Sequence, residues 1–116
     1  MNFQEKVWKL TSRIPKGKVS TYKEIAHALH TRAYRAVGTA LKANPFAPKV
    51  PCHRVIASNG LLGGYAGKMK SKKKIALLRR EGVKVKNYKI LSFRAKLFTF
   101  PKIDITKNTL PHTLPK

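Results

Sequence analysis

Proline and glycine divide this chain into a helical first part and a middle segment that excludes long regular elements. Between residues 45 and 70 stand three prolines and four glycines: Pro45, Pro48, Pro51, Gly60, Gly63, Gly64 and Gly67. Proline removes a backbone hydrogen-bond donor and glycine weakens helices and strands, so we expect only a short extended stretch here, over about residues 50–57. The whole chain has 116 residues, a length that favours a single domain.

Four helices are predicted around this segment from the spacing of apolar residues. They cover about residues 3–13, 22–29, 32–43 and 71–80. Thr21 and Glu24 have the spacing of a capping box at the start of the second helix, and Ser71 can cap the fourth. Residues 83–100 alternate apolar and basic side chains and are expected to hold a strand or two, before a loosely held tail over 101–116.

The second and third predicted helices are short and are separated by a tight break at residues 30–31. The apolar side of the third holds Ala33, Val37 and Leu41, and its other side holds Arg32 and Arg35. This arrangement is typical of a helix-turn-helix that reads DNA. An ordinary helical hairpin with a solvated charged face has the same pattern, so the pattern alone leaves both interpretations open.

The charge balance is strongly one-sided, with 26 lysines and arginines, 4 aspartates and glutamates and a formal net charge of +22. Nucleic acid is the expected partner, because phosphate neutralisation releases counterions, and an anionic membrane surface is the rival. The fourth helix adds a weak hint of an anionic partner, since three cations crowd its first turn: Lys72, Lys73 and Lys74. No apolar segment is long enough to span a bilayer and the first residues do not resemble a secretory signal, so we expect an intracellular protein.

Cys52 is the only cysteine of the chain, which excludes an intrachain disulfide and a multi-cysteine zinc site. It is therefore either buried filler or a reactive thiol. His53 and Arg54 follow it directly, and a nearby imidazole and positive charge both favour the thiolate. Neighbours in an extended segment point to opposite sides, so contact between His53 and the thiol requires a turn or a bridging water. No metal site and no cofactor are predicted.

The sequence Pro51-Cys52-His53-Arg54-Val55 resembles the active-site signature of the O6-alkylguanine-DNA alkyltransferases. Four further blocks resemble the same family in the same order, over residues 17–22, 35–38 with 44–45, 58–60 with 64–65, and 78–82. The resemblance covers about residues 3–85. It implies a mainly α fold, namely a winged-helix-like domain with a helix-turn-helix and short β segments, or α-dominated α+β.

The resemblance implies a reaction in which Cys52 removes the alkyl group from O6-alkylguanine in DNA and keeps it, so that each molecule reacts once. His53 would deprotonate Cys52 through a water, and Glu81 would orient His53. Tyr22 would supply a proton to the leaving guanine and lie against the target phosphate, and Asn44 would brace the turn that holds the cysteine. The alternative interpretation of Glu81 is a surface charge near a helix C-terminus.

The resemblance also implies a partner, double-stranded DNA containing O6-alkylguanine, whose target base is flipped out of the duplex. Arg35 would fill the vacated place in the base stack. The expected DNA-binding residues are Thr21, Tyr22, Arg32, Arg35, Gly38 and Arg54. The expected substrate pocket is lined by Pro51, Val55, Ser58, Tyr65 and Gly67. The alternative interpretation of Tyr65 is a half-buried loop anchor.

Three features depart from the family pattern. Many relatives have an N-terminal domain before the active-site domain, whereas this chain starts almost directly at the active-site domain. Ala66 stands where many relatives have a serine that contacts guanine O6, and residues after about 86 match no part of the family pattern. We therefore expect an active-site domain over residues 1–86 and a C-terminal extension of unknown structure over 87–116.

Two rival functions are weighed against alkyl transfer. Alkyltransferase-like proteins bind damaged DNA without transfer and have tryptophan at the cysteine position, whereas this chain has Cys52. A basic architectural or transcriptional DNA binder would need only the charge and the helix-turn-helix. The favoured expectation is a monomeric DNA-repair alkyltransferase without a membrane partner, cytoplasmic or, in a eukaryote, nuclear.

Overall fold

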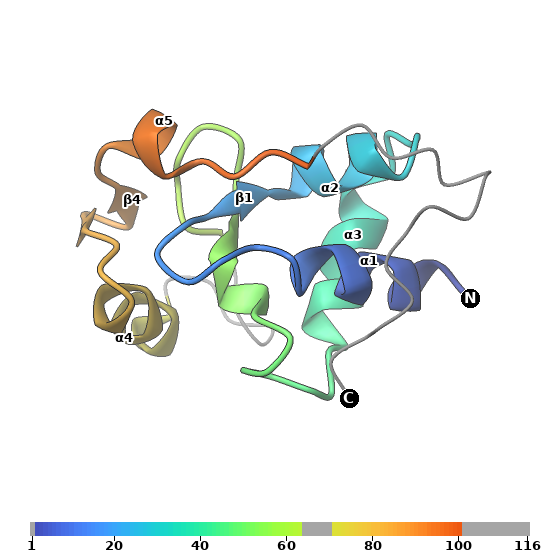
Figure 1. Cartoon of the computed structure of the whole chain (residues 1–116), viewed down its shortest axis with the longest axis horizontal. Helices are drawn as coiled ribbons and strands as arrows, with labels where there is room; N and C mark the ends of the chain where they lie inside the picture. The colour runs from blue at the N-terminus through green and yellow to red at the C-terminus, as the bar shows by residue number, and fades with distance from the viewer. Residues whose placement is uncertain (1, 64–70, 101–116) are drawn as a thin grey trace.

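The computed structural model describes residues 2–63 and 71–100 as a mainly helical body with short strands (Figure 1). The helices are α1 (Phe3–Thr11), α2 (Tyr22–Ala28), α3 (Tyr34–Lys42), α4 (Lys72–Arg80), α5 (Phe93–Lys96) and a 3-10 helix, η1 (Cys52–Arg54). The strands are β1 (Ser20–Thr21), β2 (Val55–Ile56), β3 (Val85–Lys86) and β4 (Lys89–Ile90). The predicted mainly α class is confirmed, and the four predicted helices all form within a few residues of the expected ends.

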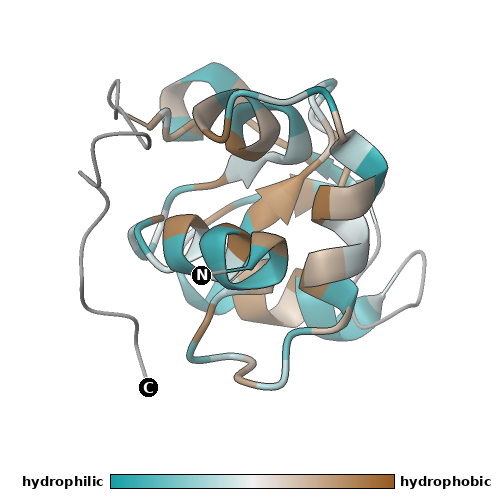
Figure 2. Ribbon diagram, turned by 90° about the vertical axis from the view of Figure 1, so that its right-hand side faces the viewer, coloured by the Kyte–Doolittle hydropathy of each residue, from teal (hydrophilic) through white to brown (hydrophobic). Residues whose placement is uncertain are grey.

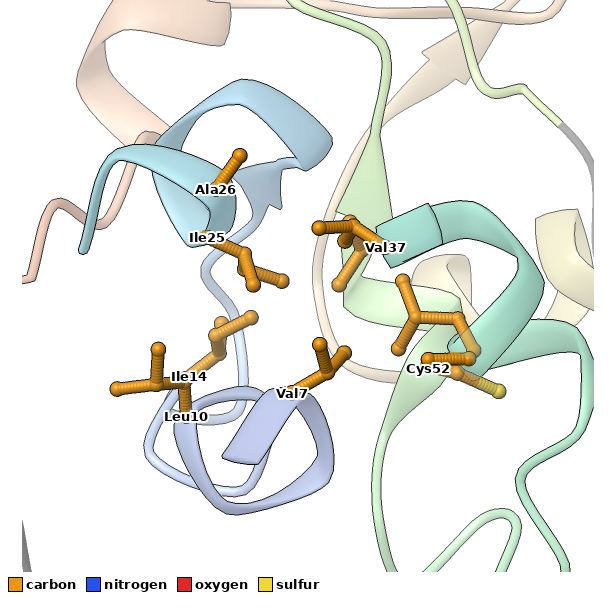
Figure 3. Close-up of a cluster of buried hydrophobic side chains, with 10 residues drawn as sticks. Val7, Leu10, Ile14, Ile25, Ala26, Val37 and Cys52 are labelled. Carbon is orange, nitrogen blue, oxygen red and sulfur yellow. The ribbon is translucent and has the colours of Figure 1, made fainter. Parts of the chain in front are cut away.

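Helices α1, α2 and α3 pack around the larger of two buried apolar clusters. α1 begins with a capping box between Asn2 and Glu5. The cluster contains Val7, Leu10, Ile14, Ile25, Ala26, Val37, Ala40, Leu41, Cys52 and Val55 (Figure 3). The Trp8 indole nitrogen donates to the Ala40 carbonyl oxygen at 2.7 Å and so ties α1 to α3. This packing holds α2 and α3 against the segment that carries Cys52.

α2 and α3 are joined by a tight turn, as the helix-turn-helix interpretation predicts. Thr21, the last residue of β1, caps α2, because its hydroxyl oxygen accepts a hydrogen bond from the Glu24 backbone N–H at 3.0 Å. α3 begins at Tyr34, two residues later than predicted, since the preceding residues belong to the turn. The buried face of α3 consists of Val37, Ala40 and Leu41.

The turn between α2 and α3 requires a residue in the left-handed conformation, and His30 supplies it with φ 57°. The His30 N–H donates to the His27 carbonyl and the Thr31 N–H to the Ala26 carbonyl, which is the hydrogen-bond pattern of a Schellman motif. Glycine usually occupies such a position, because a side chain strains this backbone conformation. The predicted break at residues 30–31 is therefore confirmed, with a histidine where glycine is usual.

A two-stranded parallel sheet joins the helix-turn-helix to the cysteine segment, since β1 leads into α2 and β2 leads out of η1. The paired residues are Ser20 with Val55 and Thr21 with Ile56. Val19, which precedes β1, is hydrogen-bonded at both backbone groups to the C-terminal segment: its N–H donates to the Lys96 carbonyl, and its carbonyl accepts from the Phe98 N–H. Three stretches far apart in the sequence therefore meet at β1.

Residues 83–100 form a hairpin and a short helix beside the second buried cluster. β3 and β4 are antiparallel, and the two residues between them, Asn87 and Tyr88, both have positive φ, as a type I′ turn requires. The cluster consists of Val19, Ile56, Leu62, Leu78, Val83, Val85 and Ile90. The boundary expected after residue 86 falls inside this hairpin, and residues 87–100 pack on the same body as α4 and β2. The expected tail over 101–116 lies outside the described residues.

Figure 1 places α1, α2 and α3 toward one end of the long axis and α4, β4 and α5 toward the other, with β1 between them. Figure 2 shows hydrophobic segments gathered between the helices and hydrophilic segments on their outer sides. Within residues 2–63 and 71–100, no helix combines the length and the apolar character needed to cross a membrane.

Candidate active site and nucleic-acid interface

Cys52 lies at the start of η1, the tight turn between Pro51 and β2. The Cys52 N–H donates to the Val50 carbonyl at 2.8 Å and the Arg54 N–H donates to the Pro51 carbonyl at 2.9 Å, so the backbone is held on both sides of the thiol. Cys52 is 9% exposed at the edge of the apolar cluster. Its sulfur points away from the centre of that cluster (Figure 3). Cys52 is therefore a buried member of this apolar cluster whose sulfur is directed outward from it.

Asn44 connects the end of α3 with the cysteine turn. Its amide nitrogen donates to the Val50 carbonyl at 2.8 Å, and its amide oxygen accepts from the Phe46 N–H at 2.9 Å. Burial raises the pKa of the Cys52 thiol above its ordinary value, and a hydrogen bond with the Asn44 side chain opposes this rise. These are the contacts that a residue bracing the cysteine segment would make.

His53 and Arg54, which follow Cys52 in the chain, form a part-buried hydrogen-bonded group with Glu81. His53 Nε2 lies 3.1 Å from Glu81 Oε2. Arg54 Nε and Nη2 donate to the two Glu81 carboxylate oxygens at 2.8 and 2.6 Å, and Arg54 Nη1 donates to the Ile14 carbonyl at 2.8 Å. The exposed fractions of the three side chains are 2% for His53, 10% for Glu81 and 16% for Arg54. The structure thus brings Glu81 to His53, as expected, and adds Arg54 to the pair.

The surroundings of this group favour a neutral His53, through burial, and an ionised Glu81, through its hydrogen bonds. Burial raises the pKa of Glu81, but hydrogen bonds from Arg54 and His53 outweigh it, so that this pKa lies below its ordinary value. Burial lowers the pKa of His53, and the hydrogen bond and charge of Glu81 offset the fall only in part. A carboxylate beside Nε2 holds the imidazole proton there and leaves Nδ1 as the basic nitrogen. Nδ1 is buried and makes no hydrogen bond to the described residues.

Lys74 is a functional candidate that the sequence analysis missed. It is fully buried, and its ammonium nitrogen donates to the Val55 carbonyl at 2.7 Å and to the Leu62 carbonyl. Burial lowers the pKa of Lys74 to about 7, and the negative charge of an ionised Cys52 opposes this fall. The lysine therefore lies within electrostatic reach of the proposed nucleophile.

A signal for the burial of Lys74 was present in the sequence. The neighbouring Lys72 and Lys73 are exposed, as a run facing an anionic partner requires. Lys74, however, precedes the buried Leu78 by four residues, which places both on one face of α4. The sequence prediction treated the three lysines as one cationic run and did not consider which of them lies on the buried face of the helix.

Two residues expected to contact DNA have hydrogen-bond partners within the protein. The Arg54 guanidinium donates to Glu81 and to the Ile14 carbonyl. Thr21 is 3% exposed, and its hydroxyl caps α2. Their contact with DNA stays a prediction.

The start of α3 is open to a ligand. Arg32 and Arg35 are exposed. Gly38 is partly exposed, and a Cβ added there would have no atom within 4 Å. These three residues, all expected to bind DNA, are therefore accessible from outside the helix.

Tyr22, the first residue of α2, lies against Gly63. A Cβ added at Gly63 would stand 2.9 Å from the Tyr22 hydroxyl oxygen, and Gly63 has φ +67°. Any residue with a side chain would therefore be strained at this position and would displace the tyrosine. The close approach brings Tyr22 to the loop that follows β2.

The expected substrate pocket is only partly within the described residues. Pro51 and Val55 are buried beside η1, and Ser58 is exposed. Three positions of the expected pocket loop lie outside the described residues: Tyr65, Ala66 and Gly67. Across residues 2–63 and 71–100, no three His, Cys, Asp or Glu side chains are grouped closely enough to hold a metal ion.

Residues 2–83 match the family described as 6-O-methylguanine DNA methyltransferase, DNA binding domain. A methylated-DNA–protein-cysteine methyltransferase of Saccharolobus islandicus is 54% identical over 83 residues, which are 72% of this chain and 52% of that protein. One of Methanosarcina barkeri is 56% identical over 66 residues, 56% of this chain and 42% of that protein. The chain therefore spans about half the length of these curated relatives.

Two solved structures share the fold and extend the comparison. The Mycobacterium tuberculosis OGT in complex with DNA has a TM-score of 0.64 and 46% identity, covering 70% of this chain and 50% of that chain. S. pombe Atl1, in complex with damaged DNA containing O6-carboxymethylguanine, has a TM-score of 0.72 and 31% identity, covering 84% of this chain and 94% of that chain. Since 84% of 116 residues is about 97, this match includes residues beyond 86, where the sequence showed no family counterpart. The chain belongs to the family of the 6-O-methylguanine DNA methyltransferase DNA-binding domain.

Proposed function

We propose that this chain repairs DNA by transferring the alkyl group of O6-alkylguanine to the sulfur of Cys52. The observation that carries the proposal is the hydrogen-bonded group of His53, Glu81 and Arg54 beside a cysteine held in a tight turn. Relatives named methylated-DNA–protein-cysteine methyltransferase support it. Because the chain spans about half of their length, the activity requires a test on this chain itself.

His53 is the proposed base for the thiol. With the Glu81 carboxylate accepting a hydrogen bond from Nε2–H, the basic lone pair of His53 is on Nδ1. A water between Nδ1 and the Cys52 sulfur would relay the thiol proton. Arg54 keeps the carboxylate ionised through two hydrogen bonds. Glu81 therefore orients the imidazole, and the proton of the thiol goes to His53.

The transfer step exchanges one bond for another at the alkyl carbon. The Cys52 thiolate attacks that carbon, a C–S bond forms, the C–O6 bond breaks, and the electron pair of the broken bond stays on guanine. The Tyr22 hydroxyl gives a proton to the leaving guanine, which departs neutral, and is reprotonated from solvent. The thioether formed on Cys52 is not ionisable, so each molecule reacts once.

The proposed partner is double-stranded DNA bound along α3 by a chain of net charge +22. Arg32 and Gly38 would contact the backbone, and Arg35 would replace the flipped base in the stack. The extruded guanine would be received by Pro51, Val55, Ser58, Tyr65 and Gly67. Two structural relatives bound to DNA support this partner. We place the working protein as a monomer on DNA, in the cytoplasm or in a eukaryotic nucleus.

Mass spectrometry tests the proposal directly. Mixing the chain with a duplex that carries one O6-methylguanine should add one methyl group per molecule, on the peptide that contains Cys52. Cys52→Ala should abolish the transfer and retain binding to the duplex, because Cys52 is buried away from the exposed start of α3. A duplex without the lesion is the control and should leave the mass unchanged.

The same experiment separates the rival functions. Selective binding of the lesion without a mass increase would reject transfer and favour a non-catalytic damage-binding protein. S. pombe Atl1, which shares this fold, is itself in complex with damaged DNA. Equal binding of both duplexes without a mass increase would favour a basic architectural or transcriptional DNA binder.

A further inference from the structure

A pocket of about 480 Å³ lies at the turn between α2 and α3, toward one end of the long axis (Figure 1). It is lined by His27, His30, Thr31 and Arg32, and both histidines and the arginine are exposed. We infer that this pocket is a pH-sensitive site for one phosphodiester of the DNA backbone, held by the two imidazoles together with Thr31 and Arg32. This inference deepens the proposed function and rests on its DNA partner.

The side chains that line the pocket suit an anion. Arg32 carries a fixed positive charge, and its guanidinium presents N–H donors in a fork that matches phosphate oxygens. The Thr31 hydroxyl oxygen accepts a hydrogen bond from the Ala33 N–H at 3.1 Å and keeps its own hydrogen for a ligand. Among the described residues, no acidic side chain lines the pocket. A phosphate group is therefore the ligand class that these donors fit.

Tyr34, the first residue of α3, holds the His27 imidazole in place. The Tyr34 hydroxyl oxygen lies 3.3 Å from His27 Nε2, and the two ring centroids are 6.1 Å apart. When the phenol donates to Nε2, the neutral imidazole has its proton on Nδ1, and the charged imidazole has a proton on both nitrogens. Nδ1 can therefore donate to a phosphate in either state, and it donates more strongly in the charged one.

His30 lines the same pocket at a cost to the backbone. Its φ of 57° is a conformation that glycine adopts without strain, whereas a Cβ is unfavourable there. Strained residues are concentrated at ligand sites, where binding makes use of the side chain. A histidine at this position, facing the same pocket as His27, indicates a role for the imidazole that glycine could not fill.

Protonation of the two histidines would add positive charge where the phosphate is held. Histidine ordinarily gains a proton near pH 6.5, and a neighbouring anion favours the charged form. Besides Tyr34, the titratable or charged groups nearest to His27 in sequence are Lys23 and Glu24 on α2 and Arg32 in the turn. Lys23 and Glu24 have opposite charges, so Arg32 and the imidazoles set the sign of the charge in the pocket. DNA binding should therefore strengthen as the pH falls.

Binding of a lesion-free duplex at pH 8 and at pH 6 tests the inference without any transfer. His30→Asn removes one imidazole and keeps a residue that tolerates positive φ, and His27→Gln removes the other. Each substitution should reduce the rise in affinity between the two pH values by about threefold. Uptake of about a quarter of a proton per imidazole, averaged over two pH units, changes the binding constant by this factor. Arg80→Gln, the loss of an exposed charge on α4, should leave the ratio of the two affinities unchanged.

His30→Gly separates binding from a structural role of the same residue. It removes the backbone strain and so should stabilise the fold, yet it should reduce the rise in affinity as His30→Asn does. A native ratio of affinities in both His27→Gln and His30→Asn overturns the inference. If the native chain accepts no alkyl group while the ratio falls in these variants, the proposed transfer fails and the phosphate site stands.

Discussion

The Glu81 carboxylate forms hydrogen bonds with two side chains. It faces the His53 imidazole on one oxygen and binds the Arg54 guanidinium through both. Burial favours the protonated acid, which accepts a hydrogen bond from the imidazole less strongly than a carboxylate does. Arg54 favours the ionised Glu81 and itself donates to the carbonyl of Ile14, which follows α1. In the proposed reaction, Arg54 would therefore act on the thiol indirectly, through Glu81 and His53.

The folded chain should lose stability as the pH falls through the range in which a free histidine becomes protonated. Burial lowers the pKa of His53, so below about pH 6.5 the unfolded chain binds a proton that the folded chain resists. The free energy of unfolding should have its full value above this pH and should decline as the pH falls toward the pKa of His53 in the folded chain. Urea denaturation between about pH 7 and 5 should show a flatter decline in His53→Gln, whose amide can still donate to Glu81. His27→Gln, at an exposed histidine, should keep the slope, and an unchanged slope in His53→Gln would assign the decline to another group.

Individual site residues were predictable when a local motif carried them. Cys52 and His53 were identified from the motif at residues 51–55 and Glu81 from the family resemblance, and the structure brings His53 and Glu81 together. The role of Arg54 was not predictable, because its partner stands 27 positions later and nothing local indicates their contact. The burial of Lys74 has a signal in its spacing from Leu78, but its hydrogen bonds to the Val55 and Leu62 carbonyls depend on the folded chain.

At the scale of elements, helices were easier to predict than strands. Each helix shows its buried face within a few turns of its own sequence, as α3 does with Val37, Ala40 and Leu41. β1 and β2 have two residues each and pair across about 30 intervening residues, so no alternation within either one identifies it. The same holds for the contact of Val19 with the segment that contains Lys96 and Phe98.

The turn between α2 and α3 should become more stable when its left-handed residue is glycine. His30→Gly should raise the free energy of unfolding by about 0.5–1 kcal/mol, because glycine adopts positive φ without strain. Ala28→Gly, which places glycine inside the last turn of α2, should lower it by a similar amount. Thermal unfolding followed by circular dichroism measures both. A lower Tm for His30→Gly would mean that the exposed imidazole makes a contact worth more than the backbone strain.

At the scale of the whole molecule, the three glutamates within the described residues lie at helix ends or in the candidate site. Glu5 completes the capping box of α1, Glu24 stands in the first turn of α2, and Glu81 is held by Arg54 and His53. These three glutamates therefore contribute to helix ends and to the site rather than to a balanced surface. The excess of positive charge is left to repel itself until a polyanion binds.

The direction from which DNA binds should appear in the salt dependence of binding. Each phosphate contact adds about −0.9 to the slope of log K against log salt concentration. Arg32→Ala should make this slope shallower by about 0.9, whereas Arg80→Ala should leave it unchanged. Both residues are exposed, but α3 and α4 lie toward opposite ends of the molecule (Figure 1). Fluorescence anisotropy with a lesion-free duplex gives the slopes, and equal changes in both variants would contradict a defined binding face.

The pairing of β1 with β2 joins the helices that would bind DNA to the turn that carries Cys52. One strand runs into the helices that would hold the duplex, and the other runs out of the turn that carries the nucleophile. In the proposed reaction, the sulfur would then keep a fixed position relative to the bound duplex. Transfer would depend on how the duplex is positioned as well as on the reactivity of the thiol.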